Sequence, residues 1–268
     1  MEVESGMIKG TFEEAGINGL RDDVIKWIRK WFAENGPDCN AIIGISGGKD
    51  STVVAALCVE ALGVDRVIGV KMPNGTQHDI DVANEVIDFL GIKSIEINIE
   101  KAFDSILAGI GTPSEQTRIN LPARLRMATL YAVAQSHNGR VANTCNLSEE
   151  WVGYSTRWGD NVGDFAPIAE FLVCTVKELG YSLGLPAKFI EKIPEDGLTG
   201  LSDEDNIGIS YEEIDKYILN GCSPKNERIE ALNDATRFKR ESVAIPTYYS
   251  FVYFDNGSNF KILNNNEI

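Results

Sequence analysis

Apolar residues follow two different patterns along the chain, and their alternation predicts the fold. Residues 41–45 (AIIGI) and 66–72 (RVIGVKM) are short apolar runs, which are typical of buried strands. Residues 79–90 instead place apolar side chains at helical spacing along one face. The pattern predicts strands at residues 41–45, 66–72, 94–99 and 140–143, and helices at residues 20–32, 52–62, 79–90, 121–135, 168–179, 211–219 and 226–236. Because strands alternate with helices, we expect an α/β fold of three layers, with helices on both faces of a mostly parallel twisted sheet.

Three segments lack these patterns. Residues 144–160 mix aromatic residues with glycines and polar residues, which predicts a loop at the carboxyl edge of the sheet, a common place for functional residues. Residues 193–209 are rich in Gly and Asp, and we interpret residues 197–208 as a mobile lid. The tail from Asn256 onward is expected to fray. The sequence shows no internal repeat and no domain boundary, so we expect a single domain over residues 1–268.

The composition narrows the choice of partners. Hydrophobic residues make up 43% of the 268 residues, which is ample for a core, and the formal net charge is −15. A nucleic-acid surface would carry a basic stripe, so the charge counts against tRNA or DNA, whereas a few local cations and a metal suffice for a small anion such as ATP. No run of residues reaches the apolar length of a membrane span, and acids near Met1 stand where a signal peptide carries bases. We therefore expect a cytoplasmic protein without nucleic-acid or membrane partners, and with reduced cysteines at positions 39, 58, 145, 174 and 222.

The segment GISGGKDS, from Gly44 to Ser51, follows the first predicted strand and leads into a helix. Paired glycines let backbone N–H groups turn toward an anion, and the positive end of the helix dipole points at the same place. The segment is not a Walker loop, because three residues separate Gly44 from Gly48 and Asp50 follows Lys49. A carboxylate beside a triphosphate becomes favourable when Mg²⁺ lies between them. We therefore predict a cradle for phosphate and Mg²⁺; the alternative is an ordinary strand-to-helix turn with Ser51 as N-cap.

A second polar group lies in the helix predicted at residues 121–135. Pro122 occupies a permitted first-turn position, and Asn120, Arg124 and Arg126 cluster near the same end. The helix dipole favours acids there, so the arginines do not serve helix stability. Either they bind a phosphate or carboxylate of a ligand, or they pair with surface acids, and both interpretations stay open.

The loop SGGKDS resembles the pyrophosphate loop of the ATP pyrophosphatases. Three further segments are similar to motifs of the ammonia-dependent NAD synthetases. Residues 120–127 (NLPARLRM) resemble N-x-x-A-R-x-R-M, and residues 153–168 (GYSTRWGDNVGDFAPI) resemble G-F-F-T-K-[YF]-G-D-x-x-x-D-[IL]-x-P-[LI], with Glu149 before them at the family's spacing. Residues 202–215, followed by residues 238–240, resemble the closing motifs.

The resemblance implies an adenine nucleotide alpha hydrolase-like fold and a reaction. The reaction is ATP-dependent amidation of nicotinic acid adenine dinucleotide (deamido-NAD) with ammonia to NAD, through an acyl adenylate, with release of AMP and pyrophosphate. It also implies a homodimer. The residues implied are, for ATP, Gly44, Ile45, Ser46, Gly47, Gly48, Lys49, Asp50, Ser51 and Thr144; for deamido-NAD, Asn120, Arg124, Arg157, Asp164 and Lys239; and for Mg²⁺, Asp50 and Glu149. Asp50 is then catalytic through the metal, and Asp160 is our candidate for the carboxylate that takes a proton from ammonium.

The chain departs from the family's pattern at three positions. Val173 replaces a phosphate-binding Lys, Glu195 replaces a Ser or Thr, and Phe238 replaces a His. If these departures abolished turnover, the protein would be a non-catalytic adenine-nucleotide sensor; a tRNA- or nucleobase-modifying ligase with the same loop is another alternative. Glutamine-using relatives carry an extra amidase domain, and only about forty residues precede the loop, so we expect ammonia as the nitrogen donor and no glutaminase domain.

Overall fold

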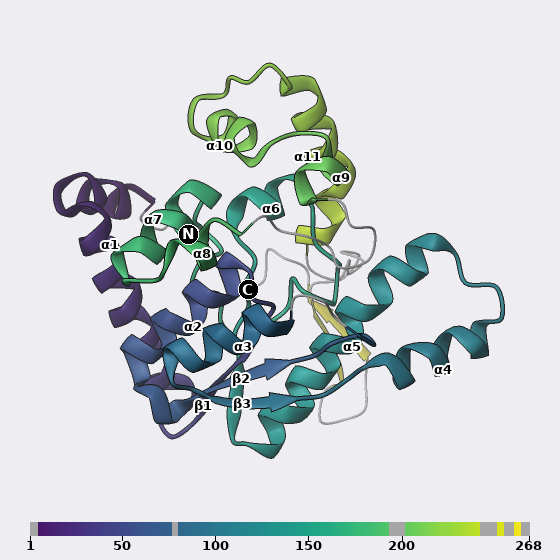
Figure 1. The fold of residues 1–268 in the computed structure, drawn as a ribbon. Coiled ribbons are helices and arrows are strands. Elements are labelled where there is room, and N and C mark those ends of the chain that lie inside the picture. Colours follow the sequence, from purple (N-terminus) through teal and green to yellow (C-terminus); the bar gives the residue numbers. More distant parts are fainter. Residues whose placement is uncertain (1–4, 77–79, 193–201, 242–250, 255–259, 264–268) are drawn as a thin grey trace.

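The computed structural model describes residues 5–76, 80–192, 202–241, 251–254 and 260–263. Four parallel strands form the central sheet in the order β3-β2-β1-β4 (Figure 1). The strands of the sheet are β1 (Asn40–Gly44), β2 (Val67–Lys71), β3 (Lys93–Glu96) and β4 (Gly139–Val141), and a separate antiparallel pair is β5 (Phe251–Phe254) with β6 (Phe260–Leu263). The helices are α1 (Ser5–Asn35), α2 (Lys49–Leu62), η1 (Val64–Arg66), α3 (Ile80–Leu90), α4 (Glu100–Ile110), α5 (Glu115–Ser136), α6 (Leu147–Val152), α7 (Val173–Ser182), α8 (Ala187–Ile190), α9 (Asp203–Ile207), α10 (Tyr211–Asn220) and α11 (Asn226–Arg240).

Successive side chains along each strand point to opposite faces of the sheet, which divides the core into two layers. Ala41, Ile43 and Ile45, in and just after β1, pack with α1, α2, α3 and α7 on one face of the sheet. Ile42 and Val70 point to the other face and pack against α5. Successive strand residues face opposite sides, so one short apolar run serves both layers. The expected three-layer α/β architecture with a parallel sheet is confirmed.

A third apolar cluster joins helices that follow the sheet in the chain. Val152 of α6, Val173 of α7, Ile207 of α9, Ile214 of α10 and Ile229 of α11 are all buried in it. In Figure 1, α9, α10 and α11 lie together on one side of the molecule, with α6 between them and the sheet. This helical cluster therefore faces the segment that follows β4.

Several boundaries differ from the sequence predictions. Helix α5 begins at Glu115, where the Ser114 hydroxyl accepts the Thr117 N–H at 3.2 Å, so Pro122 lies inside the helix and not in its first turn. Asn120 and Arg124 are consequently not at a helix N-terminus, and the dipole argument about them was wrong. The predicted helix at residues 168–179 is α7, which begins later, at residue 173.

Other elements were missed. Helix α4 was not predicted, and α6 lies inside the segment expected to be a loop. Part of the expected lid is α9, while residues 193–201, including Glu195, lie outside the described residues. The tail expected to fray contains β6, paired with β5 through Phe254 and Phe260. The letters FVYF and FKIL, separated by five residues that include Gly257, are a hairpin signal that predicts this pair.

Candidate active site

The glycine loop lies between the end of β1 and the start of α2, at the carboxyl edge of the sheet. Gly47 has φ of +78°, and a Cβ on it would lie 3.0 Å from the backbone nitrogen of Ala83, so conformation and space both require glycine. Gly48 is the N-cap of α2 with extended φ and ψ of −84° and 163°, and it brings no side chain to cap the helix. The alternative with Ser51 as N-cap was wrong. The first turn of α2 therefore has the geometry of an anion-binding site, with the positive end of the helix dipole toward the loop.

Hydroxyl groups hold the loop in this shape. The oxygens of Ser46 and Ser51 lie 3.2 Å apart, and the Gly48 N–H donates to Ser46 Oγ at 3.2 Å. Ser51 Oγ and Thr52 Oγ1 both donate to the Gly48 carbonyl, at 3.1 and 2.7 Å. The loop is therefore preorganised by its own side chains, which reduces the ordering cost of binding a ligand.

One buried asparagine connects the two predicted metal ligands. Asn146 Nδ2 donates to Asp50 Oδ1 at 3.0 Å, and Asn146 Oδ1 accepts the Glu149 N–H at 3.0 Å. Glu149 Oε2 in return accepts the Asn146 N–H at 3.3 Å, which completes a capping box at the start of α6. Asn146 is fully buried. Asn146 was not among the predicted site residues, although the pattern N-x-x-E is a signal for the capping box.

Two acids, Asp50 and Glu149, and one cation, Lys49, lie together beside the glycine loop. Burial raises the pKa of Glu149 well above its ordinary value, and the negative charge of Asp50 raises it further, against the opposing effects of Lys49 and the Asn146 N–H. The Lys49 ammonium is 3% exposed and lies 2.9 Å from Asp50 Oδ2. Burial lowers the pKa of Lys49, but Asp50 and Glu149 raise it more, so the ammonium stays charged. Lys49 therefore forms an ion pair with Asp50, and it stays a predicted ATP-binding residue.

The donor set fits Mg²⁺ bound together with phosphate. Among the described residues, no group of three or more His, Cys, Asp or Glu could hold a metal by itself. Mg²⁺ is commonly held by one or two carboxylates plus phosphate oxygens and waters, which is what Asp50, Glu149 and a neighbouring triphosphate would supply.

The residues predicted to bind deamido-NAD gather around the segment after Gly153. Asn120 Oδ1 accepts the Thr156 hydroxyl at 3.0 Å, and Arg124 Nε donates to the Arg157 carbonyl at 3.2 Å. Lys239 Nζ donates to the carbonyl of Gly153 at 2.7 Å. The structure thus brings four of the five predicted residues together, from α5, α11 and the segment between α6 and α7.

The Arg157 side chain is held between two exposed aromatic rings. Its guanidinium carbon lies 5.0 Å from the Trp158 ring centre and 5.6 Å from that of Phe238, and both rings are more than half exposed. Arg157 Nη2 donates to the Glu241 carbonyl at 3.1 Å. Trp158 has φ of +62°, a conformation that a bulky residue rarely adopts and that is common at functional sites. Phe238, where the family has His, therefore contacts a predicted binding residue.

The two remaining acids have different surroundings. Asp160 Oδ1 accepts the Thr156 N–H at 2.6 Å; burial raises the pKa of Asp160, while that N–H and Lys239 lower it. Asp164 Oδ2 accepts the Val141 N–H at 2.7 Å, so this predicted binding residue holds the edge of β4 instead of joining the cluster around Arg157. Thr144 lies after β4, two residues before Asn146, at the carboxyl edge.

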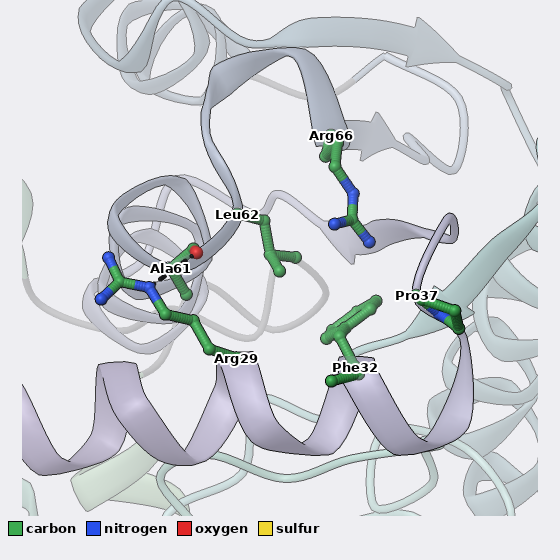
Figure 2. A pocket seen from close by; sticks show the side chains of 7 residues that line it. Arg29, Phe32, Pro37, Ala61, Leu62 and Arg66 are labelled. Carbon is green, nitrogen blue, oxygen red and sulfur yellow. Dashed lines mark hydrogen bonds between the residues drawn. The ribbon is translucent and has the colours of Figure 1, made fainter.

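A cavity of about 270 Å³ lies away from this site (Figure 2). Its lining includes Arg29 of α1 and Arg66, just before β2, so it is at the amino edge of the sheet. Arg29 donates to the carbonyls of Glu60 and Ala61 at 2.7 and 3.0 Å, the last of which Figure 2 shows as a dashed line. Cations at the carboxyl end of α2 complement the helix dipole, so we interpret this cavity as structural.

Fold and site together define an α/β protein with a glycine loop at the carboxyl edge of a parallel sheet and an Asp-Asn-Glu group beside it. A family model described as NAD synthase matches residues 20–247. An NH(3)-dependent NAD(+) synthetase from Methanocaldococcus jannaschii is 40% identical over 83% of this chain and 89% of the relative, and one from Pyrococcus furiosus is 35% identical over 80% and 83%. A solved NMN synthetase from Francisella tularensis superposes with a TM-score of 0.80 at 33% identity, covering 87% of this chain and 99% of that one. The chain belongs to the NAD synthase family. No helix within the described part of the chain is long and apolar enough to cross a membrane.

Proposed function

We propose that the protein is an enzyme that amidates nicotinic acid adenine dinucleotide with ammonia and ATP, giving NAD, AMP and pyrophosphate through an acyl adenylate. The observation that carries the proposal is the group of Asp50, Asn146 and Glu149, which stands at the N-terminus of α2 beside the glycine loop. Asp50 and Glu149 would hold Mg²⁺, which would neutralise the charge of the triphosphate when bound. The loop from Gly44 to Ser51 would then position the phosphates for attack by the nicotinate carboxylate.

The cluster around Arg157 supports the acceptor side of the proposal. Arg124 and Arg157 meet at one segment and supply planar cations for a carboxylate or a pyrophosphate, which prefer bidentate partners. Asp160 is our candidate for the proton acceptor, because a carboxylate with a raised pKa is a better base near neutral pH. Lys239 holds the Gly153 carbonyl, so we assign it to shaping this segment as well as to binding.

A second candidate substrate is the corresponding mononucleotide. The solved neighbour with a TM-score of 0.80 and 33% identity is an NMN synthetase, which favours this candidate. Both acceptors present the same nicotinate carboxylate, so the chemistry at Asp50 and Asp160 is unchanged. They differ in the adenylate half that only the dinucleotide carries, and the two acceptors must be compared directly.

The test is an assay of the purified protein with ATP, Mg²⁺ and ammonium, run once with the dinucleotide and once with the mononucleotide. The amide product and AMP are measured together, and a parallel reaction replaces ammonium with glutamine. We expect equal amounts of amide and AMP from ammonium, and a loss of at least about 100-fold in turnover for Asp50→Asn. Asp65→Asn, an exposed carboxylate at the opposite edge of the sheet, is the matched control and should match wild type. ATP binding without either product would favour the sensor, and turnover with a tRNA or nucleobase instead would favour another ligase.

We also propose that the protein is cytoplasmic and forms a homodimer. The five cysteines are free, as expected of a reducing compartment. The exposed Trp27, at 43% on α1, offers apolar surface for a second copy. Light scattering of the purified protein tests the dimer, and the glutamine arm of the assay tests the nitrogen donor.

A further inference from the structure

Tyr211 carries a buried hydroxyl without a partner. The residue is the first of α10 and is 4% exposed, and its ring belongs to the helical cluster. Its backbone N–H donates to Glu204 Oε1 at 2.8 Å, so the backbone is satisfied. The hydroxyl oxygen has no hydrogen-bond partner among the described residues. An unpaired buried hydroxyl is destabilising, so a bound water, ion or ligand is expected to supply its partner.

The surroundings of this hydroxyl belong to the nucleotide site. The Lys49 ammonium lies 5.5 Å from the centre of the Tyr211 ring, so the first residue of α10 lies beside the end of the glycine loop. The carboxylates of Glu149, Asp203 and Asp50 act electrostatically on the phenol, and together with burial they keep its pKa above the ordinary value. The phenol is therefore a neutral donor within electrostatic reach of the proposed metal ligands, and it forms a hydrogen bond with neither of them.

We infer that the Tyr211 hydroxyl donates a hydrogen bond to a phosphate oxygen of ATP bound at the glycine loop. The inference rests on the proposed function, because it takes Mg-ATP as the ligand of that loop. A bare anion would be repelled by Asp50 and Glu149, but a phosphate that arrives with Mg²⁺ brings its own positive charge and an acceptor for the hydroxyl. The contact makes α10 part of the nucleotide site, although the glycine loop and Tyr211 are 160 residues apart in the sequence.

The variant Tyr211→Phe separates this role from a structural one, because it keeps the ring and removes only the oxygen. Loss of an unpaired buried hydroxyl leaves the stability of the ligand-free protein unchanged or raised. Loss of a hydrogen bond to an anionic oxygen weakens binding of Mg-ATP by about 10- to 100-fold. Stability and affinity thus move in opposite directions, which a packing defect does not produce.

The matched control is Tyr217→Phe on the same helix. Tyr217 donates its hydroxyl to Glu230 at 2.9 Å on the surface, away from Lys49, so this variant should bind Mg-ATP as wild type does. Dissociation constants are measured by calorimetry and unfolding midpoints in the absence of nucleotide, for wild type and both variants.

The outcomes separate the inference from the proposed function. Affinity of Tyr211→Phe within about twofold of wild type, or a clear loss of ligand-free stability, overturns the inference, since a buried water or a missed partner then satisfies the hydroxyl. If wild type binds Mg-ATP without forming amide, the proposed function fails, yet the ratio of affinities still decides the role of Tyr211. If wild type does not bind Mg-ATP, both fail.

Discussion

Asp215→Asn is a sharp test of how the helical cluster is fixed. Asp215 of α10 is 5% exposed; its Oδ1 accepts the Ser148 hydroxyl at 2.5 Å and its Oδ2 accepts the Cys174 N–H at 3.0 Å. Ser148 Oγ also accepts the Val173 N–H at 3.0 Å. Two side chains from α6 and α10 therefore cap the start of α7, whose own N-cap residue supplies no hydrogen bond.

The size of the effect follows from what asparagine cannot do. An amide places one NH₂ group where a carboxylate has oxygen, so either Ser148 or the Cys174 N–H loses its acceptor in a buried place. A stranded donor and the loss of a charge-assisted bond together cost about 2–4 kcal/mol in the free energy of unfolding. For a chain of this size that corresponds to roughly 4–16 °C in melting temperature.

Urea and thermal unfolding followed by circular dichroism, without nucleotide, measure this effect. Glu212→Gln on the same helix is the control, because its pair with Lys216 is exposed and its loss should not change stability measurably. A variant at Asp215 that stays within about 0.5 kcal/mol of wild type, the scatter of ordinary surface changes, would refute the capping argument.

Two further changes test the site and its support. Glu149→Gln removes a carboxyl group whose pKa is raised in the folded protein. Such a group makes the folded state less stable as the pH rises from the ordinary pKa of Glu to the raised pKa. In urea unfolding without metal, wild type should therefore lose stability across that pH range, and the variant should not. Gly153→Ala brings a Cβ into a clash with Thr236 at φ of +64°, whereas Gly221→Ala has φ of +67° and open space. The first variant should therefore lose at least about 1 kcal/mol more in unfolding free energy than the second. Equal losses in the two glycine variants would show that the clash is relieved.

The parallel strands and the glycine loop could be predicted because their signals are local. Residues 41–45 form a short apolar run, and Ser46, Gly47 and Gly48 follow it, so the signals for the strand, the turn and the start of the helix lie in one short stretch. The gathering of Asn120, Arg124 and Arg157 was anticipated only through the resemblance, because nothing local connects α5 with the segment after α6. Helix α5 was placed too late because Pro122 was interpreted as a first-turn residue when Ser114 is the cap.

The contacts that complete the site are long-range and left no trace in a local pattern. Asn146 reaches Asp50 across 96 residues, and its role follows only once β1 and β4 are known to be neighbours. Asp164 was predicted to bind deamido-NAD from its place in a motif, and the motif did not indicate that its Oδ2 accepts the Val141 N–H. A motif gives the residue type at a position, and the structure decides which neighbour that residue meets.

The acidity of the chain is compatible with an anionic nucleotide because acids near the site are bound to helix starts. Glu149, Asp205 and Glu213 each accept the N–H of the residue that caps their helix, in three capping boxes of α6, α9 and α10. The hydroxyl and N–H of Ser202 lower the pKa of Asp205, as hydrogen bonds to a charged form do. On α9 and α10, charge held in this way is offset by the N-terminal dipole of its own helix. Glu149 lies beside Asp50, and its charge is one that the proposed Mg²⁺ would neutralise. A few cations around Arg157 and one divalent metal can therefore hold a triphosphate and a nicotinate carboxylate in a protein with a net charge of −15.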